Sequence, residues 1–233
     1  FIGIAVWLFW WLMHPEILVY QEQYQMFQTT WSYFVEHLSD CGGLSLYIAE
    51  FFVQFNLFPA TGAAILAVAM ILIMELILSL PLKIKIGFGK GRKEIILSKW
   101  VNLFAALLFV GISNWAMGDE NLLPSFIVAE ICFLTLVKAA YSSMKGRCVW
   151  NTAVLVFAVF AFWACGTSHY RIPKQFLTNP GFDEEKSEVL EYDMLVRNEK
   201  WDEIVKKAET NTPKHPLGIQ ALNLALAKND MLG

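Results

Sequence analysis

The feature that most constrains the fold of this chain is an apolar run from Ala60 to Leu80, in which Glu75 is the one charged residue. About 20 apolar residues in a helix are enough to cross the hydrocarbon core of a bilayer. The chain as a whole is 56% hydrophobic and 17% charged, whereas soluble domains contain about 25% charged residues. These values disfavour a soluble globular protein and a disordered chain, and they favour a membrane protein.

Several other segments share this apolar character. We therefore expect an all-α protein whose residues 1–166 form a polytopic transmembrane helix bundle. The expected spans are 1–13, 60–80, 100–117, 122–141 and 149–165. The first of these is too short to cross a bilayer alone, and both ends of the chain fall inside regular patterns, so we expect the protein to continue beyond them.

The charges between the spans alternate in sign. Residues 81–99 carry six Lys or Arg and one Glu, and residues 142–148 carry two basic residues and no acid, whereas residues 14–59 carry five Asp or Glu and no Lys or Arg. Basic loops remain on the cytoplasmic side of a membrane. We therefore expect the two basic loops inside the cell, and 14–59, 118–121 and everything after Cys165 on the outer, periplasmic side.

The loop 14–59 is long and strongly patterned. Two apolar stripes at helical spacing predict two amphipathic helices, separated by a break at Asp40–Gly43. The first stripe consists of Tyr20, Tyr24, Phe27, Trp31, Phe34 and Leu38, and the second of Leu44, Tyr47, Ile48, Phe51, Phe52 and Phe55. Aromatic amphipathic helices beside membrane spans are typical of segments that lie at the interface. They either cap the bundle, or their polar faces line a site that opens to the outside.

One carboxylate in this loop stands among amides. Glu22 is followed by Gln23 and Gln25, which are groups that bind sugar hydroxyls, and a buried Glu is a candidate general base. We therefore take Glu22 as a candidate catalytic residue, and Gln23 and Gln25 as candidate substrate-binding residues. The alternative is a solvated helix face with no chemical role.

A second candidate is Glu130, which lies about eight residues, or ~12 Å, into the span 122–141. A charge at this depth costs a few kcal/mol unless it is paired or faces a cavity. Glu130 is therefore a candidate catalytic residue by its position. The alternative is a packing contact, for which Asn102 and Asn114 on the preceding span are the expected partners.

Several common sites are absent from the sequence. The Gly-rich stretch Gly87–Arg92 lacks the Gly-Lys-Ser/Thr ending of a phosphate-binding loop. The four His and four Cys residues lack metal-ligand spacing, so no metal and no cofactor are expected. The net charge is −3 without a basic platform, so no nucleic-acid partner is expected either.

The composition changes after Cys165. Residues 167–182 are predicted to be a linker, and residues 183–233 have the amphipathic pattern of soluble helices. Within them, Leu195–Trp201 resembles Leu226–Leu232 at a shift of 31 residues, with two identities. This repeat looks like the tetratricopeptide (TPR) type, whose usual period is about 34 residues. Helical repeats offer extended concave surfaces, so a protein partner is expected.

Two patterns within His14–Ala63 carry a resemblance to a known family. They are Glu-Gln-Tyr-Gln-Met-Phe at 22–27, and Gly-Gly-Leu at 42–44 followed by Tyr47, Phe51 and Gln54-Phe55. With the spans and the repeat, they resemble an uncharacterised bacterial family of multi-pass membrane proteins with C-terminal helical repeats. The resemblance implies a membrane protein that presents its repeats outward, and it implies no particular activity.

A looser similarity is to multi-spanning glycosyltransferases that use lipid-linked donors. These enzymes place amphipathic helices and an acidic residue in the first outer loop, and this similarity implies Glu16 or Glu22 as the acidic residue. Two functions therefore remain open. The first is a membrane-anchored interaction protein, and the alternative is a glycosyltransferase-like enzyme that acts on lipid-linked sugars at the outer face.

Overall fold

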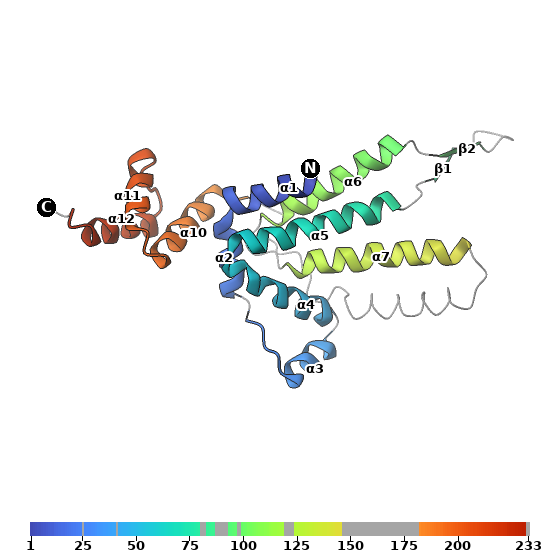
Figure 1. Ribbon diagram of the computed structural model, residues 1–233, viewed down its shortest axis with the longest axis horizontal. Coiled ribbons are helices and arrows are strands. Elements are labelled where there is room, and N and C mark those ends of the chain that lie inside the picture. Colours follow the sequence, from blue (N-terminus) through green and yellow to red (C-terminus); the bar gives the residue numbers. More distant parts are fainter. Residues whose placement is uncertain are drawn as a thin grey trace.

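The computed structural model is built almost entirely of helices. The residues it describes are 1–24, 26–40, 42–79, 83–86, 93–96, 99–118, 124–145 and 182–231. A bundle of helices is aligned with the long axis of the molecule (Figure 1). A β-hairpin lies at one end, here termed the hairpin end, and the C-terminal helices lie at the other, termed the repeat end. The predicted span 149–165, and all of the predicted linker except Phe182, lie outside the described residues.

The first helix bends sharply where a proline follows it. α1 (Ile2–Leu8) continues through a π-helical turn (Phe9–Met13), and α2 (Pro15–Tyr24) leaves at an angle of 77°. A proline disfavours helical backbone at the preceding residue, and His14 accordingly has φ −137° and ψ 46°. The bend turns α2 across the repeat end of the bundle (Figure 1).

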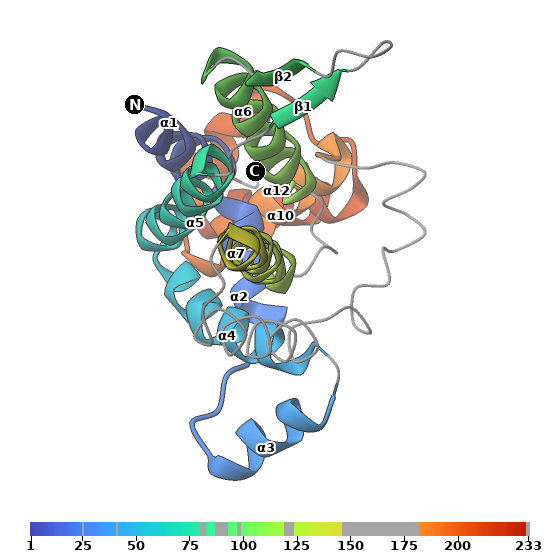
Figure 2. The same ribbon diagram turned by 90° about the vertical axis from the view of Figure 1, so that its right-hand side faces the viewer.

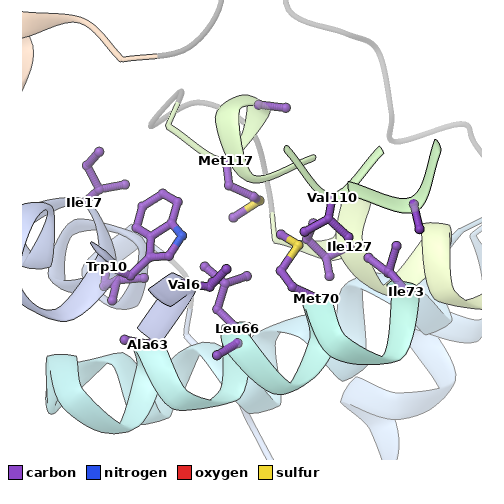
Figure 3. Close-up of a cluster of buried hydrophobic side chains, with 14 of the residues drawn as sticks. Val6, Trp10, Ile17, Ala63, Leu66, Met70, Ile73, Val110, Met117 and Ile127 are labelled. Atoms are coloured by element: carbon purple, nitrogen blue, oxygen red, sulfur yellow. The ribbon is translucent and has the colours of Figure 1, made fainter. Parts of the chain in front are cut away.

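α5 is the central helix of the bundle. It runs over Pro59–Ser79 and packs against α1, α6 (Lys99–Ala116) and α7 (Ser125–Lys145). Figure 2 shows these helices nearly end-on, with α4 alongside them. The side chains buried between them include Val6, Trp10, Leu66, Met70, Ile73, Val110, Met117 and Ile127 (Figure 3). Because α5 and α7 start at the repeat end and α6 starts at the hairpin end, successive helices are antiparallel.

A short β-hairpin joins α5 to α6. β1 (Lys83–Ile86) pairs antiparallel with β2 (Lys93–Ile96), with Lys83 opposite Ile96. The alternation of Lys and Ile in β1 has the period of two residues that is typical of a strand, a signal that the prediction of an all-α fold overlooked. Gly87–Arg92 lies outside the described residues. Apart from this hairpin, the elements of the described chain are helices, so the all-α class is confirmed.

The prediction of one long amphipathic helix before Asp40 is wrong. α2 ends at Tyr24, and α3 (Trp31–Ser39) begins after Thr30, whose Oγ1 accepts a hydrogen bond from the Tyr33 N–H at 3.4 Å. Such a threonine cap satisfies a free N–H at the start of a helix, so it competes with continuation of the helix. The predicted stripe therefore does not form one buried face, and its member Trp31 is 75% exposed.

The second amphipathic helix is present, but its aromatic stripe faces outward. α4 (Gly43–Val53) follows Gly42, whose φ of 87° favours glycine, and it ends in a 3₁₀ turn (Gln54–Leu57). The exposed members of the stripe are Phe51, Phe52 and Phe55, and the buried side of α4 consists of Gly43, Ser45, Ala49, Glu50 and Val53. An outward aromatic face is typical of a helix at a membrane interface.

Three helices form a C-terminal unit at the repeat end. They are α10 (Glu184–Arg197), α11 (Trp201–Thr210) and α12 (Pro216–Lys228). Together they enclose a small core of Tyr192, Leu195, Ile204, Ala221 and Ala225. These positions follow the amphipathic pattern of the sequence.

The 31-residue sequence repeat is also a repeat of backbone structure. Glu199, after α10, has φ 54°, and Asp230, which is 31 residues later and follows α12, has φ 55°. In the first turn the Lys200 N–H donates to the Leu195 carbonyl at 3.0 Å, and the equivalent bond in the second turn measures 2.8 Å. This is the Schellman pattern of helix ends. The two turns are therefore structurally equivalent.

One described helix, α5, is long and apolar enough to cross a membrane alone. The bent pair Ile2–Met13 and Pro15–Gln23 passes the same test only jointly, and Asn102–Ala116 in α6 is apolar but shorter. The multi-pass topology therefore stays a prediction.

Candidate functional site

A cavity of about 560 Å³ lies among α2, α4, α5 and α7. Cavities of this size commonly hold small organic ligands. Its walls are almost entirely apolar, with Leu18 from α2, Phe52 from α4, Ile65 and Leu72 from α5, and Ile131 from α7. The cavity is therefore suited to a hydrocarbon group.

Three polar residues border this cavity at the repeat end: Gln21 of α2, Asn56 of the turn after α4, and Thr61 near the start of α5. Gln21 is 4% exposed, and its Nε2 has no hydrogen-bond partner among the described residues. A buried donor without an acceptor costs roughly 1–3 kcal/mol, so Gln21 is suited to a ligand that carries an acceptor.

A second polar group joins α3 to α4. The Tyr33 hydroxyl donates to the Glu50 carboxylate, and His37 Nε2 lies 3.1 Å from the same carboxylate. His37 Nδ1 lies 2.9 Å from the Tyr33 carbonyl oxygen. Both ring nitrogens of His37 therefore lie within hydrogen-bond distance of an oxygen atom. Burial, followed by the hydrogen bond to Glu50, raises the pKa of Tyr33. The contacts of Tyr33 and His37 with Glu50 join α3 to α4.

A third group fixes the C-terminal unit to the bundle. Phe182 stacks on His14 with ring centroids 4.3 Å apart, and a Cβ on Gly118 would lie 2.7 Å from the Phe182 ring. Beside it, Ser187 of α10 donates to Glu16 Oε1 at 2.7 Å. Glu16 is buried and lies 3.1 Å from His14 Nδ1. Glu16, one of the two carboxylates that the glycosyltransferase similarity implies, thus takes part in a contact between α2 and α10.

Glu130 lies where α6 meets α7. Its Oε1 accepts a hydrogen bond from Ser113 Oγ at 3.0 Å, and its Oε2 is buried with no partner among the described residues. The predicted contact with Asn102 or Asn114 is wrong. Asn114 instead accepts a hydrogen bond from Trp10 Nε1 at 2.7 Å, which joins α6 to the π-helical turn after α1.

The described part of the chain has no group of three or more His, Cys, Asp or Glu side chains placed to hold a metal ion. The carboxylates at the helix contacts, Glu16, Glu50 and Glu130, each lie beside a hydroxyl or an imidazole.

Comparison with protein families assigns the chain to a family. The model of a family of unknown function, DUF6057, matches residues 1–172 and 167–233, which together cover the chain. The chain belongs to this family. No curated protein and no solved structure matches it. The predicted membership of an uncharacterised family is confirmed, whereas its bacterial origin, its multi-pass topology and its TPR repeats stay predictions.

The structure of this DUF6057 chain places the described predicted site residues on two helices. Glu22 and Gln23 are half-buried on α2, Glu130 is on α7, and Gln25 lies outside the described residues. None of the three described residues lines the cavity. Their chemical roles stay predictions, and no described contact favours the glycosyltransferase alternative.

Gln21 is the cavity residue that the sequence analysis missed. Gln21 follows Ile17 and Leu18 by four and three residues, which puts all three on one face of α2. Ile17 and Leu18 are themselves buried. An amide on the apolar face of a helix is the signal that could have identified it.

Proposed function

We propose that this DUF6057 chain is a multi-pass protein of the bacterial inner membrane whose bundle presents an outward-facing helical-repeat unit to another envelope protein. The bilayer is one partner and a protein is the other. The observation that carries the proposal is the contrast between the apolar bundle surface and the charged surface of α10 and α11. The contacts of Phe182 and Ser187 join the two units.

The outer surface of the bundle supports placement in lipid. Large apolar side chains are exposed on each of its helices: Ile4, Leu8 and Leu12 before the bend, Val68 and Leu72 on α5, Phe104, Leu108 and Ile112 on α6, and Phe133 and Val137 on α7. Exposed apolar surface on this scale is typical of membrane or protein contact sites. Trp100 and Trp115 are exposed at the two ends of α6, about 22 Å apart along its axis, and tryptophan is enriched at both membrane interfaces.

The arrangement of the two ends supports the predicted orientation. The basic hairpin lies at one end of the bundle and the acidic loop with the C-terminal unit at the other (Figure 1). α7 ends at the hairpin end (Figure 1), whereas Phe182 stacks on His14 at the bend before α2. A fifth span at 149–165 would return the chain from the hairpin end to the repeat end. The positive-inside rule would keep the hairpin in the cytoplasm.

The C-terminal unit has an exposed apolar face that supports a protein partner. Its exposed members are Leu217, Ile219 and Leu224 on α12, and Met231 after it. The equivalent turns at Glu199 and Asp230 support a helical-repeat array, and arrays of this kind bind partners along a continuous surface. We assign these repeats to the TPR type on their helix–turn–helix form and their period.

Two experiments test the proposal. Alkaline carbonate extraction of cell membranes should leave the protein in the pellet, and its release into the supernatant would exclude spanning helices.

A photoreactive residue at Leu224 should give a discrete cross-linked species in living cells, while the same residue at Glu209, exposed on α11, should not. Identical cross-linking patterns at both positions would contradict binding through α12.

A further inference from the structure

The long dimension of the cavity follows α5. Its lining on this helix extends from Thr61 to Leu72, a rise of about 16 Å. One leaflet contributes about 15 Å to the hydrocarbon core of a bilayer. The polar residues Gln21, Asn56 and Thr61 lie at the repeat end of this length, where the interface would be, and the remainder is apolar.

The cavity is open to the side. Val68 and Leu72 both line it, and they are 56% and 48% exposed on the outer surface of α5. The mouth is therefore continuous with the apolar surface that the proposed function places in lipid. A ligand can enter sideways from the bilayer without crossing water.

We propose that this cavity binds one acyl chain of a diacyl glycerophospholipid of the outer leaflet, and that Gln21 Nε2 donates a hydrogen bond to the ester oxygen of that chain. This inference rests on the proposed bilayer placement and adds a ligand site to it. A glycerophospholipid carries its ester oxygens where the chain meets the headgroup, which is the depth at which Gln21 lies relative to the apolar length of the cavity.

A packed helix fits the cavity less well than an alkyl chain. A helix with its side chains is about 10–12 Å across, whereas a single alkyl chain is much thinner. The backbone carbonyls of a membrane helix are also paired within the helix, and they leave Gln21 without an acceptor. A thin chain with an ester at one end supplies both the shape and the acceptor.

The test uses the purified full chain in vesicles of phosphatidylethanolamine and phosphatidylglycerol that contain a phosphatidylethanolamine with a diazirine on one acyl chain. After irradiation, the cross-linked peptides should include 61–72 and 127–132, which line the cavity.

Val68→Trp would block the mouth and should reduce this labelling about tenfold, the effect of overfilling a packed site. Val137→Trp is the matched control, because Val137 is exposed on α7 and does not line the cavity. Equal labelling in both variants would overturn the proposal.

The role of Gln21 has a separate readout. Unlabelled diacyl lipid should compete with the probe better than its diether analogue, which lacks the ester carbonyl, by about threefold to tenfold, the range expected of one hydrogen bond. Gln21→Leu should abolish this preference while the variant keeps the thermal unfolding profile of the wild type. Absence of the preference in the wild type would overturn the assignment of the ester contact.

The failure of this inference is distinguishable from that of the proposed function. Release of the protein by alkaline carbonate would remove the bilayer placement, and with it both proposals. Retention in the membrane combined with cross-links spread evenly over α5, α6 and α7 would overturn the lipid site alone. A disulfide between Ala64→Cys and a cysteine in 149–165 or in a second copy would show that a helix fills the cavity, and it would also overturn the lipid site.

Discussion

The bundle and the C-terminal unit are both packed helices, yet their surfaces are opposite. The bundle exposes leucine, isoleucine, valine and phenylalanine on the outer faces of α5, α6 and α7, whereas α10 and α11 expose charges that pair along one helix, such as Asp193 with Arg197 at 2.7 Å and Lys200 with Glu203 at 3.0 Å. Exposed pairs of this kind contribute little stability. Under the proposed function, the bundle surface faces lipid and the C-terminal unit faces water.

The two units also differ in how polar groups are used. In the bundle, polar side chains join helices to one another, as Ser113 does with Glu130 and Trp10 with Asn114. In the C-terminal unit they also cap helices: Asp183 caps the first turn of α10, and His215 caps that of α12. This unit has contacts between elements as well, since Lys207 pairs with Glu191 and Asn229 donates to Asp202. Helix ends need such caps where water competes for the backbone, and helix contacts need polar pairs where lipid leaves no alternative partner.

The largest expected effect compares one substitution in the two units. Leu108→Asp, on the exposed face of α6, should destabilise the protein by about 3 kcal/mol, because a carboxylate near the middle of a span is costly. Leu224→Asp, exposed to a similar degree on α12, should change stability by no more than about 0.5 kcal/mol, as at an ordinary solvated surface. Denaturant unfolding of the purified protein in detergent measures both. Equal small effects would mean that the bundle surface faces water.

The second prediction concerns the junction between the units. Phe182→Ala removes the ring that stacks on His14 and packs against Gly118, and for a half-buried ring this should cost about 2 kcal/mol. Hydrogen exchange in α10 should then become roughly 30-fold faster, while exchange in α5 is unchanged. Faster exchange in both helices would show that the units unfold together and that the junction is not separable.

The third prediction tests the equivalence of the two repeat turns. Glu199 and Asp230 occupy left-handed backbone, so Glu199→Gly and Asp230→Gly should each stabilise the C-terminal unit by about 0.5–1 kcal/mol. Asn198→Gly is the control, because Asn198 has φ −85° and gains nothing from glycine. Thermal unfolding compares the three variants. Stabilisation by only one of the first two would contradict a structural repeat.

The smallest expected effect at neutral pH is that of Tyr192→Phe. The Tyr192 hydroxyl is buried without a partner among the described residues, so its removal should change stability by about 0.5 kcal/mol or less. Burial, and then Glu188 and Glu191, raise the pKa of Tyr192 above its usual value. The wild-type unit should therefore keep its stability below about pH 10 and lose it as the pH rises towards the raised pKa. Tyr192→Phe should lack this alkaline loss in melts recorded across pH, and an identical loss would contradict it.

Tyr33→Phe serves as the contrasting variant for this measurement. Tyr33 donates to Glu50, so removal of its hydroxyl should cost about 1.5–3 kcal/mol at neutral pH, the range for a hydrogen bond to a charged group.

Sequence patterns predicted the elements whose character is set by many residues at once. The apolar run 60–80 predicts a single long helix, and α5 occupies Pro59–Ser79. The 31-residue repeat predicted two equivalent turns because the residues that end a helix are local. By contrast, the break between α2 and α3 depends on one Thr30 cap, which a periodic stripe does not reveal.

The hydrogen-bond partner of Glu130 was the least predictable feature of the structure. Ser113 and Asn114 are adjacent on α6 and point about 100° apart, so the rotation of the helix decides which of them meets Glu130. That rotation follows from the packing of Val110 and Met117 against α5 and α7, and no local sequence signal encodes it. The same reason explains why Glu22, which has the more conspicuous composition around it, lies off the cavity while Gln21 lines it.

The most direct measurement is the labelling of single cysteines in intact cells with a membrane-impermeant maleimide. In a background where Cys41, Cys132, Cys148 and Cys165 are replaced by serine, Glu184→Cys in α10 should react from outside, and Lys90→Cys should react only after lysis. Reaction of Lys90→Cys from outside, with Glu184→Cys protected until lysis, would contradict the proposed orientation and the outward-facing repeat unit.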